Sequence, residues 1–255
     1  PDDDQARLLQ DKGIEHERAF LERLRTGGAT VADIPSTGTL AERVELTRKA
    51  LRDGPDVIYQ GALYAPPWHG YSDFLLKVPG VASNLGDYAY DIADTKLART
   101  VKPKHVIQLC IYADLLQAEQ GVPPPSLKVA LGTGVITTVR TDDVRHYGAI
   151  ARRRFEAFAG TEPVGVTAAE PCGHCTFCRW KAECEGVWET TEHLSLVAGI
   201  NRSQRDKLQA LGIMSMRDLA GAGAGVGAAI GLPASTFEKL HDQARLQIAR
   251  RDTGD

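Results

Sequence analysis

Residues 88–96 read YAYDIADTK, and their alternation of apolar and polar side chains is typical of a β-strand. Successive side chains of a strand point to opposite faces, so Ile92, Asp94 and Lys96 share one face and Asp91 points the other way. The segment therefore places a carboxylate beside an ammonium at the end of a strand. Such a carboxylate can bind a hard divalent cation, while the ammonium steadies a phosphate or positions a water molecule.

The flanking segments alternate between helix-like and strand-like patterns. We predict helices at residues 5–26, 40–52, 102–120 and 142–158, and strands at residues 57–64, 68–77, 88–96, 127–131 and 135–139. Thr39 would cap the second helix, Gly121 would end the third, and residues 79–87 would separate two strands, with turns at Asn84 and Gly86. This order predicts an α/β fold with a mixed sheet, in which the helix at residues 102–120 is a crossover.

Composition limits the class of protein. The 255 residues are 43% hydrophobic and 25% charged, as in an ordinary soluble globular protein. No apolar run approaches the ~20 residues of a membrane span, and no signal peptide opens the chain, so we expect a cytoplasmic protein without membrane contact. The net charge of −3 gives no global argument for nucleic acid, although local basic tracts can still bind it. The first residue is Pro1, and we expect that upstream residues are missing.

A second carboxylate lies in the preceding predicted strand, where Asp73 precedes the apolar run Phe74-Leu75-Leu76. A carboxylate buried there without a partner would cost several kcal/mol, and a bound metal would offset that cost. The alternative is that Asp73 begins a loop or caps a neighbouring element.

Three helical residues are weaker candidates. His16 lies on the apolar stripe of the first helix, as a core residue or as a ligand, and the flanking Glu15 and Glu17 could also reach a cation. Gln108 and Tyr112 are four residues apart and share one helix face.

Taken together, these groups resemble a known family. Gly13-x-x-His16, Gly70-x-x-Asp73, Asp94-x-Lys96 and Gln108-x-x-x-Tyr112 follow one another within residues 10–185, as in the RecB-like nucleases of the PD-(D/E)XK superfamily. The resemblance implies a restriction-endonuclease-like core and a metal-dependent DNA nuclease. We expect an exonuclease that acts on single strands or ends, within a DNA repair, recombination or defence protein and with a helicase domain or subunit as partner.

The resemblance also implies a role for each matching residue. Asp73, Asp94, Lys96, Gln108 and Tyr112 would be catalytic, and His16, Asp73, Asp94 and the carbonyl of Thr95 would hold Mg²⁺ or Mn²⁺. Arg99, Lys102 and Lys104 follow the strand directly and would contact the DNA backbone. The later run Arg152-Arg153-Arg154 would be either a further clamp or a solvated helix face.

Four of the five cysteines form the run Cys172-x2-Cys175-x2-Cys178-x5-Cys184. Thiols this close indicate metal ligation in a reducing compartment rather than a disulfide framework. A zinc ribbon normally separates its two cysteine pairs by a dozen or more residues, whereas three cysteines at this spacing are typical of iron–sulfur proteins. We therefore predict a [4Fe–4S] cluster, with zinc as the alternative.

RecB-like nucleases of the CRISPR-associated and helicase-fused groups are similar in this region, but they usually draw one ligand from a cysteine upstream of the core. No cysteine precedes Cys110 here, so either Cys172 takes that place or the upstream residue was lost with the N-terminus. We expect Cys110 to be an inert core thiol, and Trp180 and Trp188 to pack around the cluster.

Changes in composition predict three parts: residues 1–165 as the nuclease core, residues 166–190 as a cysteine cluster closing onto it, and residues 191–255 as a small helical subdomain. The last part resembles a helix–hairpin–helix element, which binds phosphates through backbone amides, and simple helix packing is the alternative. Gly221–Ala229 would be a flexible joint.

Two competing hypotheses remain for function. The first is a catalytically silent DNA-binding or scaffold module that keeps the fold and the cluster, although intact Asp73, Asp94 and Lys96 argue against it. The second is a zinc-stapled nuclease that processes RNA.

Overall fold

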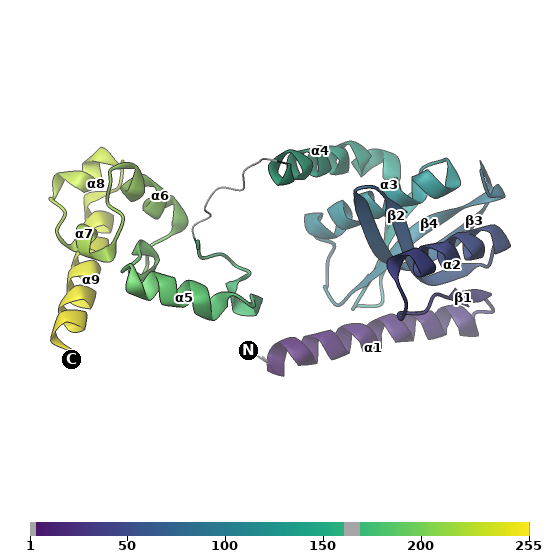
Figure 1. Ribbon diagram of the computed structural model, residues 1–255, viewed down its shortest axis with the longest axis horizontal. Coiled ribbons are helices and arrows are strands. Elements are labelled where there is room, and N and C mark those ends of the chain that lie inside the picture. Colours follow the sequence, from purple (N-terminus) through teal and green to yellow (C-terminus); the bar gives the residue numbers. More distant parts are fainter. Residues whose placement is uncertain (1–3, 161–168, 255) are drawn as a thin grey trace. The chain divides into compact units, whose positions relative to one another are not determined.

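A six-stranded mixed sheet lies at the centre of the first of two units (Figure 1). The computed structural model describes residues 4–160 and 169–254, and the chain divides into Asp2–Pro163 and Val164–Asp255. The strands follow the sheet in chain order: β1 (Val31–Asp33), β2 (Val57–Ala65), β3 (Trp68–Ser83), β4 (Gly86–Lys96), β5 (Ser126–Leu131) and β6 (Ile136–Arg140). β1–β2 and β4–β5 are parallel pairs and the other neighbours are antiparallel, which confirms the predicted α/β fold with a mixed sheet.

Helices cover both faces of this sheet (Figure 1). The first unit contains α1 (Asp4–Thr26), α2 (Leu40–Asp53), α3 (Pro103–Gln120) and α4 (Thr141–Ala159). α1 covers one face, where Phe20 and Leu21 join Phe74 in a buried cluster. α2 and α3 contribute to the larger cluster on the opposite face, and α4 packs against α3. Each parallel strand pair is connected by a helix, α2 after β1 and α3 after β4. The connection through α3 confirms the predicted crossover, whereas the one through α2 was not predicted.

Local sequence signals set the helix ends as predicted. Thr39 and Glu42 form a capping box at the start of α2, in which the Glu42 amide donates to Thr39 Oγ1 and the Thr39 amide donates to Glu42 Oε2 at 2.7 Å. α3 ends at Gly121, whose φ of 79° lies in the left-handed region that glycine adopts without strain.

Two strand predictions needed correction. β1 was missed, because three residues are too few to establish a periodic pattern. β3 continues through Pro79 to Ser83, where the sequence predicted a connection. β2 pairs with β3 only as far as Leu76, so beyond that residue one edge of β3 has no neighbouring strand. Pro79 lies in this part of β3, where its missing N–H interrupts no hydrogen bond to β2. The turn itself falls at Asn84 as predicted, and Gly86 opens β4.

The second unit is helical around its own core. It consists of two 3₁₀ turns, η1 (Cys175–Phe177) and η2 (Leu194–Leu196), and the helices α5 (Lys181–Thr190), α6 (Arg202–Ala210), α7 (Met216–Ala220), α8 (Gly225–Ala229) and α9 (Ala234–Thr253). Leu194, Leu208, Met216 and Leu219 are fully buried in its core. Capping boxes begin α6 at Asn201 and α7 at Ser215. The structure of residues 191–254 is helical, as predicted, and its last helix, α9, spans 20 residues.

The predicted flexible joint at Gly221–Ala229 is wrong in its second half. α8 occupies residues 225–229, and Val226 packs against the buried cluster of this unit. A Cβ added at Gly227 would lie 2.7 Å from Phe237, so the small residue permits close packing against α9.

The cysteine segment belongs to the second unit. Trp188 of α5 donates its indole N–H to the carbonyl of Ala169, and Glu170 pairs with the buried Arg205 of α6 at 3.1 Å. The prediction that this segment closes onto the first unit stays a prediction. Among the described residues, none of the helices is long and apolar enough to cross a membrane.

Two helical glycines test the packing of the first unit. A Cβ added at Gly148 would lie 2.4 Å from the Cβ of Cys110, whereas Gly13 has no atom within 4 Å of that position. Gly148→Ala should therefore lower the free energy of unfolding by about 1–3 kcal/mol. Gly13→Ala is the matched control and should raise it by about 0.5–1 kcal/mol, because alanine is the better helix former. Urea denaturation measures both, and a stabilising Gly148→Ala would contradict the α3–α4 contact.

Candidate active site

The pairing of β3 with β4 brings Asp73 and Asp94 together. Phe74 pairs with Ala93 in the antiparallel register, so Asp73 and Asp94 are the next residues in line on the two strands. Regular backbone pairing of β3 with β4 ends there, and the Asp73 side chain makes the next hydrogen bonds between the two strands. Its Oδ2 accepts hydrogen bonds from the amide and from the hydroxyl of Thr95, both at 2.9 Å.

An irregularity in β2 and β3 determines where Asp73 points. Ile58 and Leu63 of β2 both pack into the cluster on the α2 and α3 face, although residues five apart on a regular strand face opposite ways. Between them Gln60 has a φ of 58°, in the left-handed region, and the register leaves Gln60 and Asp73 as the unpaired position between two regular stretches. Asp73 therefore lies where the strand pair switches faces.

Two side chains hold Gln60 in this conformation. Arg43 of α2 donates to the Gln60 carbonyl at 3.3 Å and stacks its guanidinium on the Tyr71 ring. Glu17 of α1 accepts a hydrogen bond of 2.5 Å from the Gln60 side chain. Sequence reasoning missed Gln60 and Arg43, because no sequence pattern marks a glutamine with positive φ.

The two carboxyl groups perturb each other. Burial, followed by the negative charge of Asp94, raises the pKa of Asp73 to about 6, although the Thr95 hydrogen bonds act in the opposite direction. Burial also raises the pKa of Asp94, against the opposing effect of Lys96. The site therefore holds two carboxyl groups that are costly to ionise without a neighbouring cation.

Lys96 supplies the nearest cation. Its Nζ lies 2.5 Å from Oδ2 of Asp94, which is almost fully buried. That oxygen makes no hydrogen bond of regular geometry, so the ammonium is its main electrostatic partner. The predicted juxtaposition of Asp94 and Lys96 on one face of β4 is present.

α3 brings Gln108 and Tyr112 to the same site. Gln108 donates to the Tyr112 hydroxyl at 3.0 Å, and Asp94 and Asp73 both contribute to the raised pKa of that hydroxyl, after burial as the main cause. A Cβ added at Gly70 would lie 2.4 Å from the Tyr112 ring. Glycine at this position thus lets the tyrosine reach β3 close to Asp73.

The first helix provides two further groups. His16 Nε2 lies 3.1 Å from the carbonyl of Ala130, which is the β5 partner of Thr95 in the parallel register. Of the two flanking acids, Glu15 pairs with Lys12 at the surface, whereas the charge of Glu17 helps raise the pKa of Asp94. Glu17 is therefore the flanking carboxylate that approaches the site.

These residues suit a hard cation only in part. Within residues 4–160 and 169–254, no group of three or more histidine, cysteine and acidic side chains forms a ready-made metal site. Two neighbouring carboxyl groups, Asp94 buried and Asp73 partly buried, are nevertheless the type of donor that Mg²⁺ and Mn²⁺ prefer, and one Asp94 oxygen makes no regular hydrogen bond. Candidates for a third ligand on α1 are His16, whose Nε2 lies at the Ala130 carbonyl, and Glu17, one oxygen of which accepts a hydrogen bond from Gln60.

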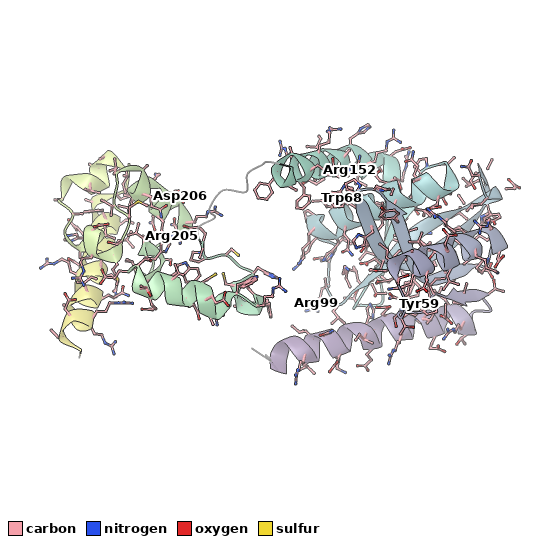
Figure 2. The ribbon with its side chains drawn as sticks, in the orientation of Figure 1. Tyr59, Trp68, Arg99, Arg152, Arg205 and Asp206 are labelled. Atoms are coloured by element: carbon pink, nitrogen blue, oxygen red, sulfur yellow. The ribbon has the colours of Figure 1, made fainter. Side chains whose placement is uncertain are left out.

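The predicted DNA-contacting residues are exposed. Arg99, Lys102 and Lys104 lie between the end of β4 and the first turn of α3, and no carboxylate of the described chain lies within ion-pair distance of any of them. Arg99 is labelled in Figure 2. Arg152 instead pairs with Asp114 of α3 at 2.6 Å and so helps hold α4 in place.

Two of the four clustered cysteines are in contact in the second unit, although the thiols form no ready-made metal site among the described residues. The Sγ atoms of Cys172 and Cys175 are 3.9 Å apart, and the Cys172 amide donates to Cys175 Sγ. Burial and the neighbouring Cys178 and Cys175 raise the pKa of the Cys184 thiol. Cys110 of α3 is buried in the core of the first unit, and burial raises the pKa of its thiol to about 11, as expected of an inert core residue.

The two aromatic residues near the cysteines differ. Trp188 is buried and stacks on His193, whereas Trp180 is exposed and lies beside Arg179.

Comparison with protein-family models and with curated proteins found no match to this chain.

The raised pKa of Asp73 predicts that the ionised Asp73 carboxylate lowers the free energy of unfolding in a pH-dependent way. The folded state binds the Asp73 proton more tightly than the unfolded state, so between about pH 4 and pH 6 stability falls as the pH rises. In EDTA at pH 7, Asp73→Asn should therefore raise the free energy of unfolding by about 1–2 kcal/mol, and the difference should vanish at pH 4. Asp87→Asn, at an exposed position of β4, is the control without effect. If Asp73→Asn were less stable than the wild-type protein at pH 7, the ionised Asp73 carboxylate would not be destabilising.

Proposed function

We propose that this chain is a metal-dependent DNA nuclease with a restriction-endonuclease-like core, similar to the RecB-like nucleases. The observation that carries the proposal is the meeting of Asp73 and Asp94 at the point where β3 and β4 separate, beside the ammonium of Lys96. A site that concentrates negative charge in a partly buried place is costly unless it binds cations. An anionic phosphodiester can approach such carboxylates only with cations between them.

Each residue has a distinct task in hydrolysis. Asp73 and Asp94 would hold Mg²⁺ or Mn²⁺ with His16 or Glu17, and Thr95 positions Asp73 through its amide and hydroxyl. The bound ion supplies a polarised phosphoryl oxygen and a water of lowered pKa. Lys96 places its ammonium against the attacked phosphate or orients the water, which stabilises negative charge as it develops. Gln108 and Tyr112, which are hydrogen-bonded to each other, would line the α3 side of the site beside the carboxyl groups.

Exposed basic residues would hold the substrate. Arg99, Lys102 and Lys104 carry charges without an ion-pair partner among the described residues, next to the strand that ends in Lys96. Contacts of this kind bind the phosphate backbone without regard to base sequence. We place exonuclease action on single strands or ends in a repair, recombination or defence protein, with a helicase domain or subunit as partner.

The cysteine run would hold a [4Fe–4S] cluster with a structural role. The spacing of the four cysteines and the contact between Cys172 and Cys175 support metal ligation by this run. Because Glu170 and Trp188 tie the flanking residues to the helical unit, a cluster here would fix the start of that unit.

One observation favours the catalytically silent alternative. The Lys96 ammonium lies against Asp94 Oδ2, where a cation would bind, so the site is already neutralised in part. A DNA-binding module without hydrolysis would retain this ion pair permanently.

Digestion assays separate the two functions. Linear single-stranded and duplex DNA would be incubated with Mn²⁺ and the wild-type protein, Asp94→Ala, Lys96→Ala or the control Asp87→Asn. Asp94→Ala and Lys96→Ala should each lower the rate at least about a hundredfold, because each removes charge stabilisation from the transition state. Asp87→Asn should digest at the wild-type rate. Equal rates in all four proteins would exclude the nuclease function.

Metal analysis of anaerobically purified protein tests the cluster. We expect about four irons per chain, and loss of that iron in Cys175→Ser but not in Cys110→Ser. One zinc per chain would instead support the zinc-stapled alternative. Protein with neither metal would refute ligation by the cysteine run.

A further inference from the structure

The outward face of α4 carries an unusual amount of exposed aromatic surface. Tyr147, Phe155 and Phe158 are 57%, 56% and 76% exposed, and Ile150 adjoins them. Tyr147 and Phe158 are eleven residues apart, which is close to three full helical turns, so they lie on one side of the helix. Exposed apolar groups gathered on one face indicate a binding surface rather than chance.

This surface is positively charged as well as aromatic. Arg154 lies seven residues after Tyr147 and four before Phe158, so its guanidinium lies between the two rings along the same side. Arg153 and Arg154 are exposed, and neither has a carboxylate partner within the described ranges. Their neighbour Arg152 differs because Asp114 neutralises it.

Trp68 connects this surface to the proposed active site. The Trp68 and Phe155 ring centroids are 5.5 Å apart, and the indole N–H donates to Glu156 of α4 at 2.6 Å, so Trp68 lies against the end of α4 (Figure 2). Trp68 begins β3, the strand that carries Gly70 and Asp73. At about 3.3 Å per residue, roughly 16 Å of strand separate Trp68 from Asp73, the span of a short run of nucleotides.

We propose that Trp68, Phe155, Phe158 and Arg154 form a stacking platform for the unpaired bases of single-stranded DNA that enters the site along β3. Aromatic rings bind bases of any sequence through their faces, and interleaved arginines bind the phosphates between them. In a duplex the bases are stacked on one another, so their faces are not available to the aromatic side chains of the protein. The proposal rests on the proposed nuclease function and specifies its substrate as a single strand.

Binding measurements without hydrolysis test the platform. All variants are made in the Asp94→Ala protein with EDTA present, and fluorescence anisotropy reports the affinity for a short labelled oligothymidine and for a duplex. Phe158→Ala should weaken oligothymidine binding about tenfold and leave duplex binding unchanged, because loss of one stacked base has an effect of that order. Phe158 has no ring partner among the described residues, so its loss leaves the fold intact, whereas Phe155→Ala also removes the Trp68 contact.

Matched variants show whether the weaker binding of Phe158→Ala results from the loss of base stacking. Phe158→Trp should retain tight oligothymidine binding, since stacking requires a ring and not phenylalanine itself. Leu46→Ala removes an exposed apolar residue on α2 and should change nothing. Arg154→Ala should weaken binding more at low salt than at high salt, unlike Arg52→Ala on α2.

The outcomes separate the two proposals. Oligothymidine affinity that is indifferent to Phe158→Ala and Arg154→Ala overturns the platform, whether or not the wild-type protein digests DNA. Equal losses for oligothymidine and duplex would also overturn it, because they would show a general electrostatic surface. Selective loss of single-strand binding in a protein that never digests DNA would support the platform and refute the nuclease.

Discussion

The electrostatic cost of two neighbouring carboxyl groups dominates this structure. Asp73 and Asp94 occupy adjacent positions on paired strands in a place that excludes much of the solvent, and the pKa of each is raised by burial. A sequence selected for stability alone would place apolar residues at such a position, because buried charge contributes less than good packing. The proposed binding of a cation would offset this cost, because a positive charge between the two groups stabilises their ionised forms.

Several parts of the first unit serve to hold this pair in place. The strand irregularity at Gln60 and Asp73 turns one carboxyl toward the amide of Thr95, and Arg43 and Glu17 fix Gln60 from the helices on either face of the sheet. Gly70 admits the Tyr112 ring beside the same strand. The positive φ of Gln60 is costly, as is the burial of Arg43, which forms no ion pair within residues 4–160 and 169–254. Such features concentrate where function requires a particular geometry.

The sequence predicted the regular elements well, because hydrophobic period and capping chemistry are local. The Thr39 capping box, the Gly121 helix end and the alternation around Asp94 were each visible in a few consecutive residues. The predictions that failed depended on non-local context. Pro79 stays in β3 because the neighbouring strand has already ended, and the small residues near Gly227 form a helix because Phe237 packs on them. The meeting of Asp73, Asp94, Lys96 and Tyr112 followed the predicted order of motifs, whereas Gln60 and its supports had no sequence signal.

The position of Lys96 can be understood from the same balance of charge. Without a divalent ion, its ammonium lies against Asp94 and provides the positive charge that this buried carboxylate requires. A divalent ion at Asp94 would reduce the need for this ion pair, so the Lys96 ammonium would be available to an anionic phosphate. In this proposal one lysine stabilises the resting site and then the reacting phosphate, and the alternation of side chains along β4 is what keeps it within reach of both. A lysine moved by one position would face the opposite side of the sheet and could do neither.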